Sequence, residues 1–182
     1  MELRILRESG YEEALLGLSL SFNRDPGTMP AVAQRLAFKG DGHNKFLESI
    51  VAWLDVRAPR YFWQQLDTYR VGVTKQSEST MHTMTRTQLQ QEHFEHPLPE
   101  DLLRHLNELI AADRWQEVKS LLPESFLQRR ILCTNYMALQ RMIRQRSTHR
   151  LPEWKRFISE LLRQATHPEL LVPESTKEPY DV

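Results

Sequence analysis

The stretch RILCTNYMALQRMIRQR, residues 130–146, is interpreted as a buried strand that leads directly into a helix. From Asn135 to Gln145 the apolar residues recur at intervals of three and four, which is the spacing of an amphipathic helix. We therefore predict a strand over 130–134 and a helix that begins at Asn135.

One residue of this stretch departs from the expected pattern, because Arg146 extends the apolar stripe of the helix. It lies three residues after Ile143 and four after Met142. A buried guanidinium needs an anionic partner, since an unpaired buried charge is very costly. Two interpretations stay open. The side chain reaches water at the helix end, where the helix dipole favours a cation, or it binds a phosphate or a polarised carbonyl through paired hydrogen bonds.

The segment around Arg146 is basic, and acids are absent between residues 125 and 152. Its cations are Arg129, Arg130, Arg141, Arg144, Arg146, Arg150, Lys155 and Arg156. A run of charge usually forms a solvated face, and the alternative is a local site for a small anionic ligand. Because the whole chain has 24 Lys+Arg against 24 Asp+Glu, we expect no extended nucleic-acid binding, which needs a strong positive field.

The rest of the chain predicts an alternation of strands and helices, with a mainly helical C-terminal half. The expected strands are 2–8, 50–56 and 71–74. The expected helices are 11–22, 30–38, 60–69, a stretch from Pro99, 115–122 and 152–164. Residues 76–96 are polar and lack a clear period, so we interpret them as a long loop.

The 182 residues are expected to form a single domain over 1–168, followed by a flexible C-terminal tail over 169–182. No apolar run approaches the ~18 residues of a membrane span. The N-terminus lacks the apolar stretch of a signal peptide, so we expect a cytoplasmic protein. The one cysteine, Cys133, excludes an internal disulfide framework and a multi-cysteine metal site.

Few short motifs point to chemistry by themselves. His93 and His96 have the spacing of two helical metal ligands, but no third ligand is evident, so we expect no metal. Ser79 has no obvious base partner in the sequence, which argues against a nucleophilic serine. Neither a glycine-rich dinucleotide-binding pattern nor a Walker-type phosphate loop is present.

An ordered series of motifs is more informative than any one of them. The first is Gly42-His43-Asn-Lys-Phe-Leu-Glu48, in which the glutamate follows the histidine by five residues. Gln65 then stands three residues before Thr68-Tyr69-Arg70. A short serine-containing loop follows at Ser77-Glu-Ser79.

The series continues in the C-terminal half with defined spacings. Lys119 stands four residues before Pro123, Asn135 stands twelve residues after that proline, and Arg146 follows eleven residues later. In this order and spacing the chain resembles the flavin-dependent thymidylate synthases, over roughly residues 2–160.

The resemblance implies an α+β fold, with a mainly antiparallel sheet flanked by helices, and a homotetramer whose sites lie between subunits. It also implies an enzyme that transfers a one-carbon unit from methylenetetrahydrofolate to C5 of dUMP, with FAD as the cofactor and NADPH as the reductant. The flavin performs the hydride chemistry in this family, so no protein nucleophile is required.

The resemblance assigns roles to eight residues of this chain. Arg146 matches the family arginine that contacts the pyrimidine, where a cation can stabilise negative charge developing on the ring. The other matches to nucleotide contacts are Gln65, Ser79 and Lys119, the last reaching the nucleotide from a neighbouring subunit. The matches to positions near the flavin are His43, Arg70, Asn135 and Arg141.

Two departures from the family pattern bear on the ligand. The family's Arg-His-Arg is Thr68-Tyr69-Arg70 here, and the arginine that ends its serine loop is Met81. Each lost charged hydrogen bond weakens binding of an anionic nucleotide by ~1.5–3 kcal/mol. Two alternatives therefore stay open: the same fold acting on another pyrimidine nucleotide, such as a modified-base precursor, or a non-catalytic nucleotide-binding or interaction protein.

Overall fold

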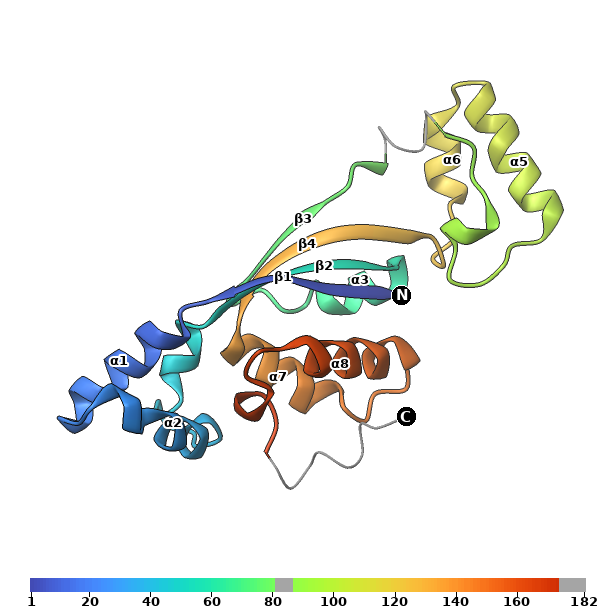
Figure 1. Ribbon diagram of the computed structural model, residues 1–182. Coiled ribbons are helices and arrows are strands. Elements are labelled where there is room, and N and C mark those ends of the chain that lie inside the picture. Colours follow the sequence, from blue (N-terminus) through green and yellow to red (C-terminus); the bar gives the residue numbers. More distant parts are fainter. Residues whose placement is uncertain (81–86, 174–182) are drawn as a thin grey trace.

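A four-stranded antiparallel sheet in the order β1-β2-β4-β3 forms the centre of the structure (Figure 1). The computed structural model describes residues 1–80 and 87–173. The strands are β1 (Glu2–Ser9), β2 (Val51–Pro59), β3 (Val73–Ser77) and β4 (Leu127–Asn135). Every neighbouring pair is antiparallel, and helices accompany the sheet, so the expected α+β class is confirmed.

Seven α-helices lie within the described residues. They are α1 (Tyr11–Phe22), α2 (Met29–Ala37), α3 (Arg60–Leu66), α5 (Glu100–Ala111), α6 (Trp115–Leu121), α7 (Tyr136–Arg146) and α8 (Pro152–Gln164). The short 3₁₀ turns are η1 (Pro26–Thr28), η2 (Lys45–Glu48), η3 (Gln91–His93) and η4 (Pro168–Leu170). Figure 1 shows α7 and α8 along one face of the sheet, with α1 and α2 at one end and α5 and α6 beyond the other.

Strand β2 shows why helices cover only one face of the sheet. Ala52, Leu54 and Val56 have no exposed surface, whereas Trp53 and Asp55 between them are half-buried. Successive side chains of a strand point to opposite faces, so the first set faces the helices and the second set lies on the open face. The predicted strand over 50–56 is confirmed and extends to Pro59.

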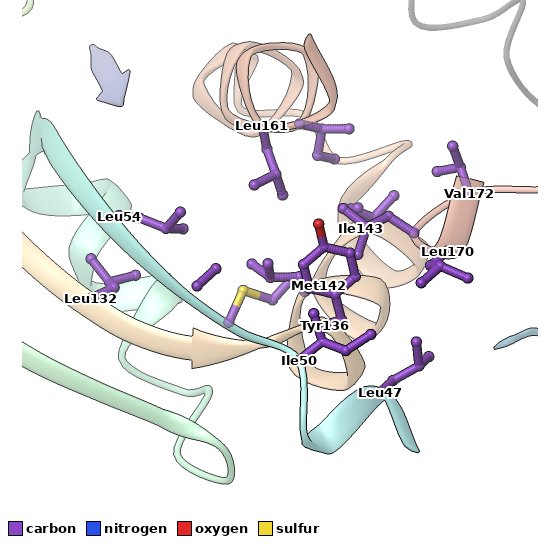
Figure 2. Close-up of a cluster of buried hydrophobic side chains, with 14 of the residues drawn as sticks. Leu47, Ile50, Leu54, Leu132, Tyr136, Met142, Ile143, Leu161, Leu170 and Val172 are labelled. Carbon is purple, nitrogen blue, oxygen red and sulfur yellow. The ribbon is translucent and has the colours of Figure 1, made fainter. Parts of the chain in front are cut away.

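The main core lies between this covered face and the helices. Figure 2 shows Leu54 and Leu132 of the sheet in one cluster with Met142 of α7 and Leu161 of α8. All four side chains have no exposed surface. Fully burying one such side chain stabilises a protein by about 1.5–3 kcal/mol, so this layer fixes α7 and α8 against the sheet.

The edge of the sheet at β1 is covered by a side chain of α8. Gln164 donates its Nε2 hydrogen to the Leu3 carbonyl at 2.9 Å, and its Oε1 accepts from the Ile5 amide at 3.0 Å. A free strand edge presents unpaired backbone groups that invite further pairing. The glutamine satisfies two of these groups and sets the position of α8 along the strand.

A second, smaller core stabilises a lobe formed by residues 87–126, named here the α5–α6 lobe. Its buried members are Leu89, Phe94, Leu106, Leu109, Val118, Leu122 and Phe126. Phe94 and Phe126 pair as an isolated bridge, with their ring centroids 5.8 Å apart. The lobe therefore has its own apolar interior at the start of β4.

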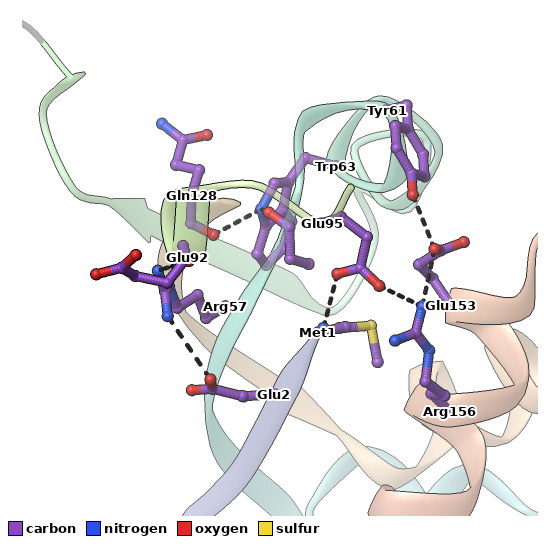
Figure 3. A network of polar contacts seen from close by, with 11 residues as sticks. Met1, Glu2, Arg57, Tyr61, Trp63, Glu92, Glu95, Gln128, Glu153 and Arg156 are labelled. Atoms are coloured by element: carbon purple, nitrogen blue, oxygen red, sulfur yellow. Dashed lines mark hydrogen bonds and ion pairs between the residues drawn. The ribbon is translucent and has the colours of Figure 1, made fainter. Parts of the chain in front are cut away.

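A polar network attaches this lobe to the main body (Figure 3). Glu95 of the lobe accepts a hydrogen bond from Arg156 of α8, and Arg156 also pairs with the buried Glu153 at 3.0 Å. Tyr61 of α3 donates its hydroxyl proton to Glu153 at 2.8 Å. Burial and this acceptor raise the pKa of Tyr61, so the phenol stays protonated as a donor.

The C-terminal boundary of the packed structure lies later than expected. The tail was expected to begin at 169, but Leu170, Leu171 and Val172 are only 1%, 2% and 4% exposed. These apolar side chains gain free energy by packing on the core (Figure 2). The expectation for 169–172 is wrong because the Pro- and charge-rich composition begins only at Pro173, and residues 174–182 lie outside the described residues.

The expectation of an unstructured loop over 76–96 also requires correction. Strand β3 continues through Ser77, η3 occupies Gln91–His93, and Phe94 pairs with Phe126. Cross-strand pairing with β4 supplies the order that local periodicity does not indicate. Residues 81–86, with Met81, lie outside the described residues. In the described part of the chain, no helix is long and apolar enough to cross a membrane.

Candidate functional site

Helix α7 begins where Asn135 caps it. The Asn135 Oδ1 accepts a hydrogen bond from the Ala138 amide at 2.9 Å, which satisfies one of the free amides of the first turn. Gly72 lies against this side chain, since a Cβ on Gly72 would be 3.0 Å from the Asn135 Nδ2. The cap and the close approach of the chain at Gly72 fix the start of α7 beside β3.

Arg146 occupies the last turn of α7, beside the rings of Tyr69 and Trp154, which contact each other edge to face. Its Nε donates to the Tyr69 hydroxyl at 2.9 Å. Its guanidinium carbon lies 5.5 Å from the centroid of the Tyr69 ring and 5.1 Å from that of Trp154. Both distances are within the range of cation–π attraction. Arg146 is half-buried and pairs with no carboxylate of residues 1–80 or 87–173.

The two rings connect Arg146 to Gln65 of α3. Tyr69 is buried, and its hydroxyl donates to the Gln145 Oε1 at 2.9 Å. Trp154 has no exposed surface, and its indole Nε1 donates to the Gln65 Oε1 at 2.8 Å. The structure thus brings Gln65 and Arg146, two of the residues expected to contact a nucleotide, around one pair of aromatic side chains.

Further cations lie beside this group. The Lys75 Nζ donates to the Tyr69 carbonyl at 3.1 Å and pairs with Asp67 at 3.2 Å. Arg130 pairs with the same carboxylate at 3.0 Å and stacks over Trp63 at 4.5 Å. Lys75 and Arg130 thus share the Asp67 carboxylate, and Arg146 beside them pairs with no carboxylate of the described residues. The local balance is positive, which suits an anionic ligand.

The basic segment predicted around Arg146 is partly neutralised in the folded chain. Arg129 donates to Asp55 on the open face of the sheet, at 2.6 and 2.8 Å. Arg130 faces Asp67 as described above. Asp55 of β2 and Asp67 at the end of α3, both remote in sequence, thus offset these two charges, and Glu95 and Glu153 offset Arg156. Arg146 pairs with no acid of the described residues and lies near the Trp154 ring that bonds Gln65.

Three of the four residues matched to the flavin, His43, Asn135 and Arg141, lie at or beside the first half of α7. His43 is exposed and precedes Asn44, whose amide lies 3.6 Å from the Met137 sulfur in the first turn of the helix. Arg141, one turn further, donates through its Nη2 to the Val71 carbonyl at 3.0 Å. Since an α-helix rises about 1.5 Å per residue, Asn135 and Arg146 lie about 16 Å apart along α7, with Arg141 between them.

Three other expected site residues have different surroundings. Arg70 is exposed and has no hydrogen-bond or ion-pair partner in the part of the chain that the structure describes. Ser79 is exposed and follows β3. Lys119 is exposed on α6, in the α5–α6 lobe, away from α7 (Figure 1). A single chain does not bring Lys119 together with Arg146.

Sequence reasoning did not identify Tyr69 and Trp154 as members of the site. Tyr69 stands in the middle of the altered Thr68-Tyr69-Arg70 motif. This position was the only feature of the sequence that could have pointed to Tyr69 as a site residue. Trp154 gave no signal beyond its place on the apolar face of α8. Its role depends on the packing of α8 against α3, which no local pattern encodes.

Comparisons with known proteins match the fold and not the sequence. No family model and no curated protein sequence matches the chain. Two crystal structures of the flavin-dependent thymidylate synthase ThyX from Helicobacter pylori, each with FAD and dUMP, are similar in fold. The first has a TM-score of 0.81 at 17% identity, covering 94% of this chain and 98% of that one. The second, at 2.31 Å resolution, has a TM-score of 0.80 at 17% identity over 97% and 99%.

The expected fold is therefore confirmed over nearly the whole chain: it is the fold of flavin-dependent thymidylate synthases. The overall fold is thus shared at an identity of only 17%. What the chain binds and does rests on its own side chains.

Proposed function

We propose that this protein is a divergent flavin-dependent thymidylate synthase that binds dUMP and transfers a one-carbon unit to C5 of its pyrimidine. The observation that supports the proposal most strongly is the convergence of Gln65 and Arg146 around Tyr69 and Trp154. These two residues are separated by 81 positions in the sequence (146 − 65), and the fold that joins them is that of enzymes solved with FAD and dUMP.

Arg146 and Gln65 have chemically suitable roles toward a pyrimidine. The guanidinium supplies fixed donors and a positive charge, which stabilise negative charge that develops on the ring when a bond forms at C5. Gln65 offers its amide hydrogens, because its Oε1 already accepts from Trp154. Lys75 and Arg130 add to the positive potential and favour a ligand that bears a phosphate.

The donors near the first half of α7 fit a flavin dinucleotide. Arg70 has no partner among the described residues, and Arg141 uses its Nη2 for one backbone carbonyl. His43 and the Asn135 amide complete a set of hydrogen-bond donors suited to a diphosphate and to ring carbonyl oxygens. When bound, FAD supplies the hydride chemistry, with NADPH as the reductant and methylenetetrahydrofolate as the one-carbon donor.

We also propose that the active protein is a homotetramer in which Lys119 reaches the nucleotide site of a neighbouring subunit. This arrangement accounts for the position of Lys119 on the exposed face of α6, away from Arg146 of its own chain. A neighbouring α5–α6 lobe would bring a further cation to the site and offset the arginine that Thr68 replaces.

A visible absorption spectrum of the purified protein tests the flavin part of this proposal. We expect a yellow protein with flavin bands that bleach when NADPH is added without oxygen. Thermal unfolding tests the nucleotide part, because a ligand that binds the native state raises the midpoint by mass action. dUMP should raise it more than other mononucleotides. A colourless, folded protein that FAD does not stabilise would contradict the proposal.

A further inference from the structure

The guanidinium of Arg146 is only partly used by the protein itself. Its Nε donates to the Tyr69 hydroxyl, and its guanidinium carbon lies within cation–π distance of both the Tyr69 and the Trp154 rings, which contact each other edge to face. Among the described residues, no hydrogen bond to either Nη is present. An arginine held in this way presents the paired Nη hydrogens, which is the edge that binds planar anionic or carbonyl groups.

The hydroxyl of Tyr69 has a defined direction in this group. It donates to the Gln145 Oε1 at 2.9 Å, so its lone pairs remain to accept from the Arg146 Nε at 2.9 Å. A phenol supplies one donor and accepts as well, and both functions are occupied here. Because Tyr69 is buried and its backbone carbonyl accepts from Lys75, the ring has little freedom to turn.

Trp154 fixes the orientation of the Gln65 amide, the second donor of the site. An indole nitrogen can only donate, so the oxygen of the Gln65 amide must face Trp154 and its Nε2 hydrogens must point elsewhere. The same indole contacts the Arg146 guanidinium at 5.1 Å. One buried side chain therefore sets the orientation of both expected ring contacts.

We propose that Tyr69 and Trp154 are positioning residues that hold Arg146 and Gln65 as a preformed set of donors for the acceptor groups of the bound pyrimidine. That the bound ligand is a pyrimidine rests on the proposed function. That Tyr69 and Trp154 fix the orientation of Arg146 does not depend on it. Preorganised donors need no reorientation when the ligand binds or when charge develops on the ring. Tyr69 thus has a role toward Arg146 that follows from its hydroxyl, not only from its bulk.

The first test uses the ligand-free protein, so its result does not depend on dUMP. In ¹⁵N NMR of arginine-labelled protein, the Arg146 Nε–H should exchange slowly with water. Tyr69→Phe keeps the ring and removes the hydroxyl. We expect this variant to speed Nε–H exchange by about tenfold, equivalent to ~1.4 kcal/mol. Tyr61→Phe, a matched loss of one phenol hydrogen bond in a separate network, should leave it unchanged.

The second test measures the affinity for dUMP by calorimetry, in single and double variants. Tyr69→Phe should weaken binding by about tenfold in the native background and have no effect in Arg146→Gln. Tyr61→Phe should bind as the native protein does. Unfolding midpoints of all variants show whether each is folded. A residue with only a structural role would weaken binding equally in both backgrounds.

The outcomes separate the two proposals. The positioning role is overturned, whatever the ligand, if the Arg146 Nε–H exchanges rapidly with water in the native protein. It is also overturned if that hydrogen exchanges at the same rate in Tyr69→Phe as in the native protein. Protected Nε–H with no dUMP binding by a folded native protein overturns the proposed function and leaves the positioning of Arg146 supported. If the double variant loses the sum of the binding free energies lost by the two single variants, Tyr69 does not act through Arg146. Protection together with the non-additive pattern supports both proposals.

Discussion

The guanidinium of Arg146 is the group on which the proposed nucleotide site depends. Arg146→Gln removes the charge and the forked donors but keeps a polar side chain of similar reach. Each charged hydrogen bond contributes ~1.5–3 kcal/mol, so we expect the Kd for dUMP to rise about 10–100-fold. Isothermal calorimetry on folded protein measures this change directly.

Arg144 provides the matched control on the same helix. It lies two residues before Arg146, is exposed, and has no ion pair among the described residues. Arg144→Gln makes the same change of charge and should leave the affinity for dUMP within about twofold of native, since surface substitutions change free energies by only ~0.5 kcal/mol. Equal losses in both variants would show that bulk charge, not a specific contact, attracts the nucleotide.

For individual residues, the helical spacing predicted that Arg146 continues the apolar stripe of α7. It did not predict which side chains contact the guanidinium. The three-and-four spacing placed it on the buried face of α7 correctly. The second interpretation, binding of a phosphate or a carbonyl group, is the basis of the proposed nucleotide site. The guanidinium contacts Tyr69 and Trp154, two partners that neither interpretation named. Those contacts join α3, α7 and α8, and tertiary packing between remote segments has no local sequence pattern.

Among the elements, the three strands β1, β2 and β4 are joined on the open face through Asp55. Its carboxylate accepts from Arg129 of β4 and lies 3.4 Å from Arg4 of β1. The hydrogen bond from Arg129 and the charges of both arginines hold the pKa of Asp55 below its ordinary value, against the effect of burial. The folded state therefore binds a proton at Asp55 less readily than the unfolded chain.

This depressed pKa predicts how the stability of the sheet depends on pH. The contribution of Asp55 is fully present above its unfolded pKa of about 3.9 and is lost as the pH falls through the lower folded value. We expect Asp55→Asn to be less stable than native protein at pH 7, with the difference shrinking as the pH falls below about 4. Urea unfolding at a series of pH values measures both curves. A difference that is constant across this range would contradict the assignment.

Two segments show where a prediction of secondary structure from local composition fails. Most strands and helices were predicted within a few residues, because strong alternation or three-and-four spacing comes directly from burial. The exceptions are segments ordered by partners: β3 pairs with β4 through Ser77, and Leu170–Val172 packs on α7. In both cases a polar or Pro-rich neighbourhood concealed a short stretch that gains its stability from distant residues.

For the whole molecule, the fold matches known structures at 17% identity although no family model recognises the sequence. A shared pattern of buried positions is enough to specify the sheet order and the covering helices. At the candidate site, in contrast, Thr68-Tyr69-Arg70 departs from the family's Arg-His-Arg pattern. The sequence therefore predicted the fold better than it predicted the residues that contact the ligand.

The proposed sharing of sites between subunits predicts complementation between two inactive variants. Lys119→Ala and Arg146→Gln should each lack activity alone. In a co-expressed mixture, a site needs Arg146 from one subunit and Lys119 from another, and random assembly restores about a quarter of the sites. Activity that stays absent in a tetrameric mixture would show that both residues act from the same chain, and a Lys119→Ala variant that is active alone would show that Lys119 has no role.

Release of tritium from C5-labelled dUMP is the measurement that tests the account most directly, because it reports replacement of the C5 hydrogen on the proposed substrate. With FAD, NADPH and methylenetetrahydrofolate, the native protein and Arg144→Gln should release tritium at the same rate, and Arg146→Gln should release little. A folded, flavin-loaded native protein that releases none would contradict the proposed synthase activity.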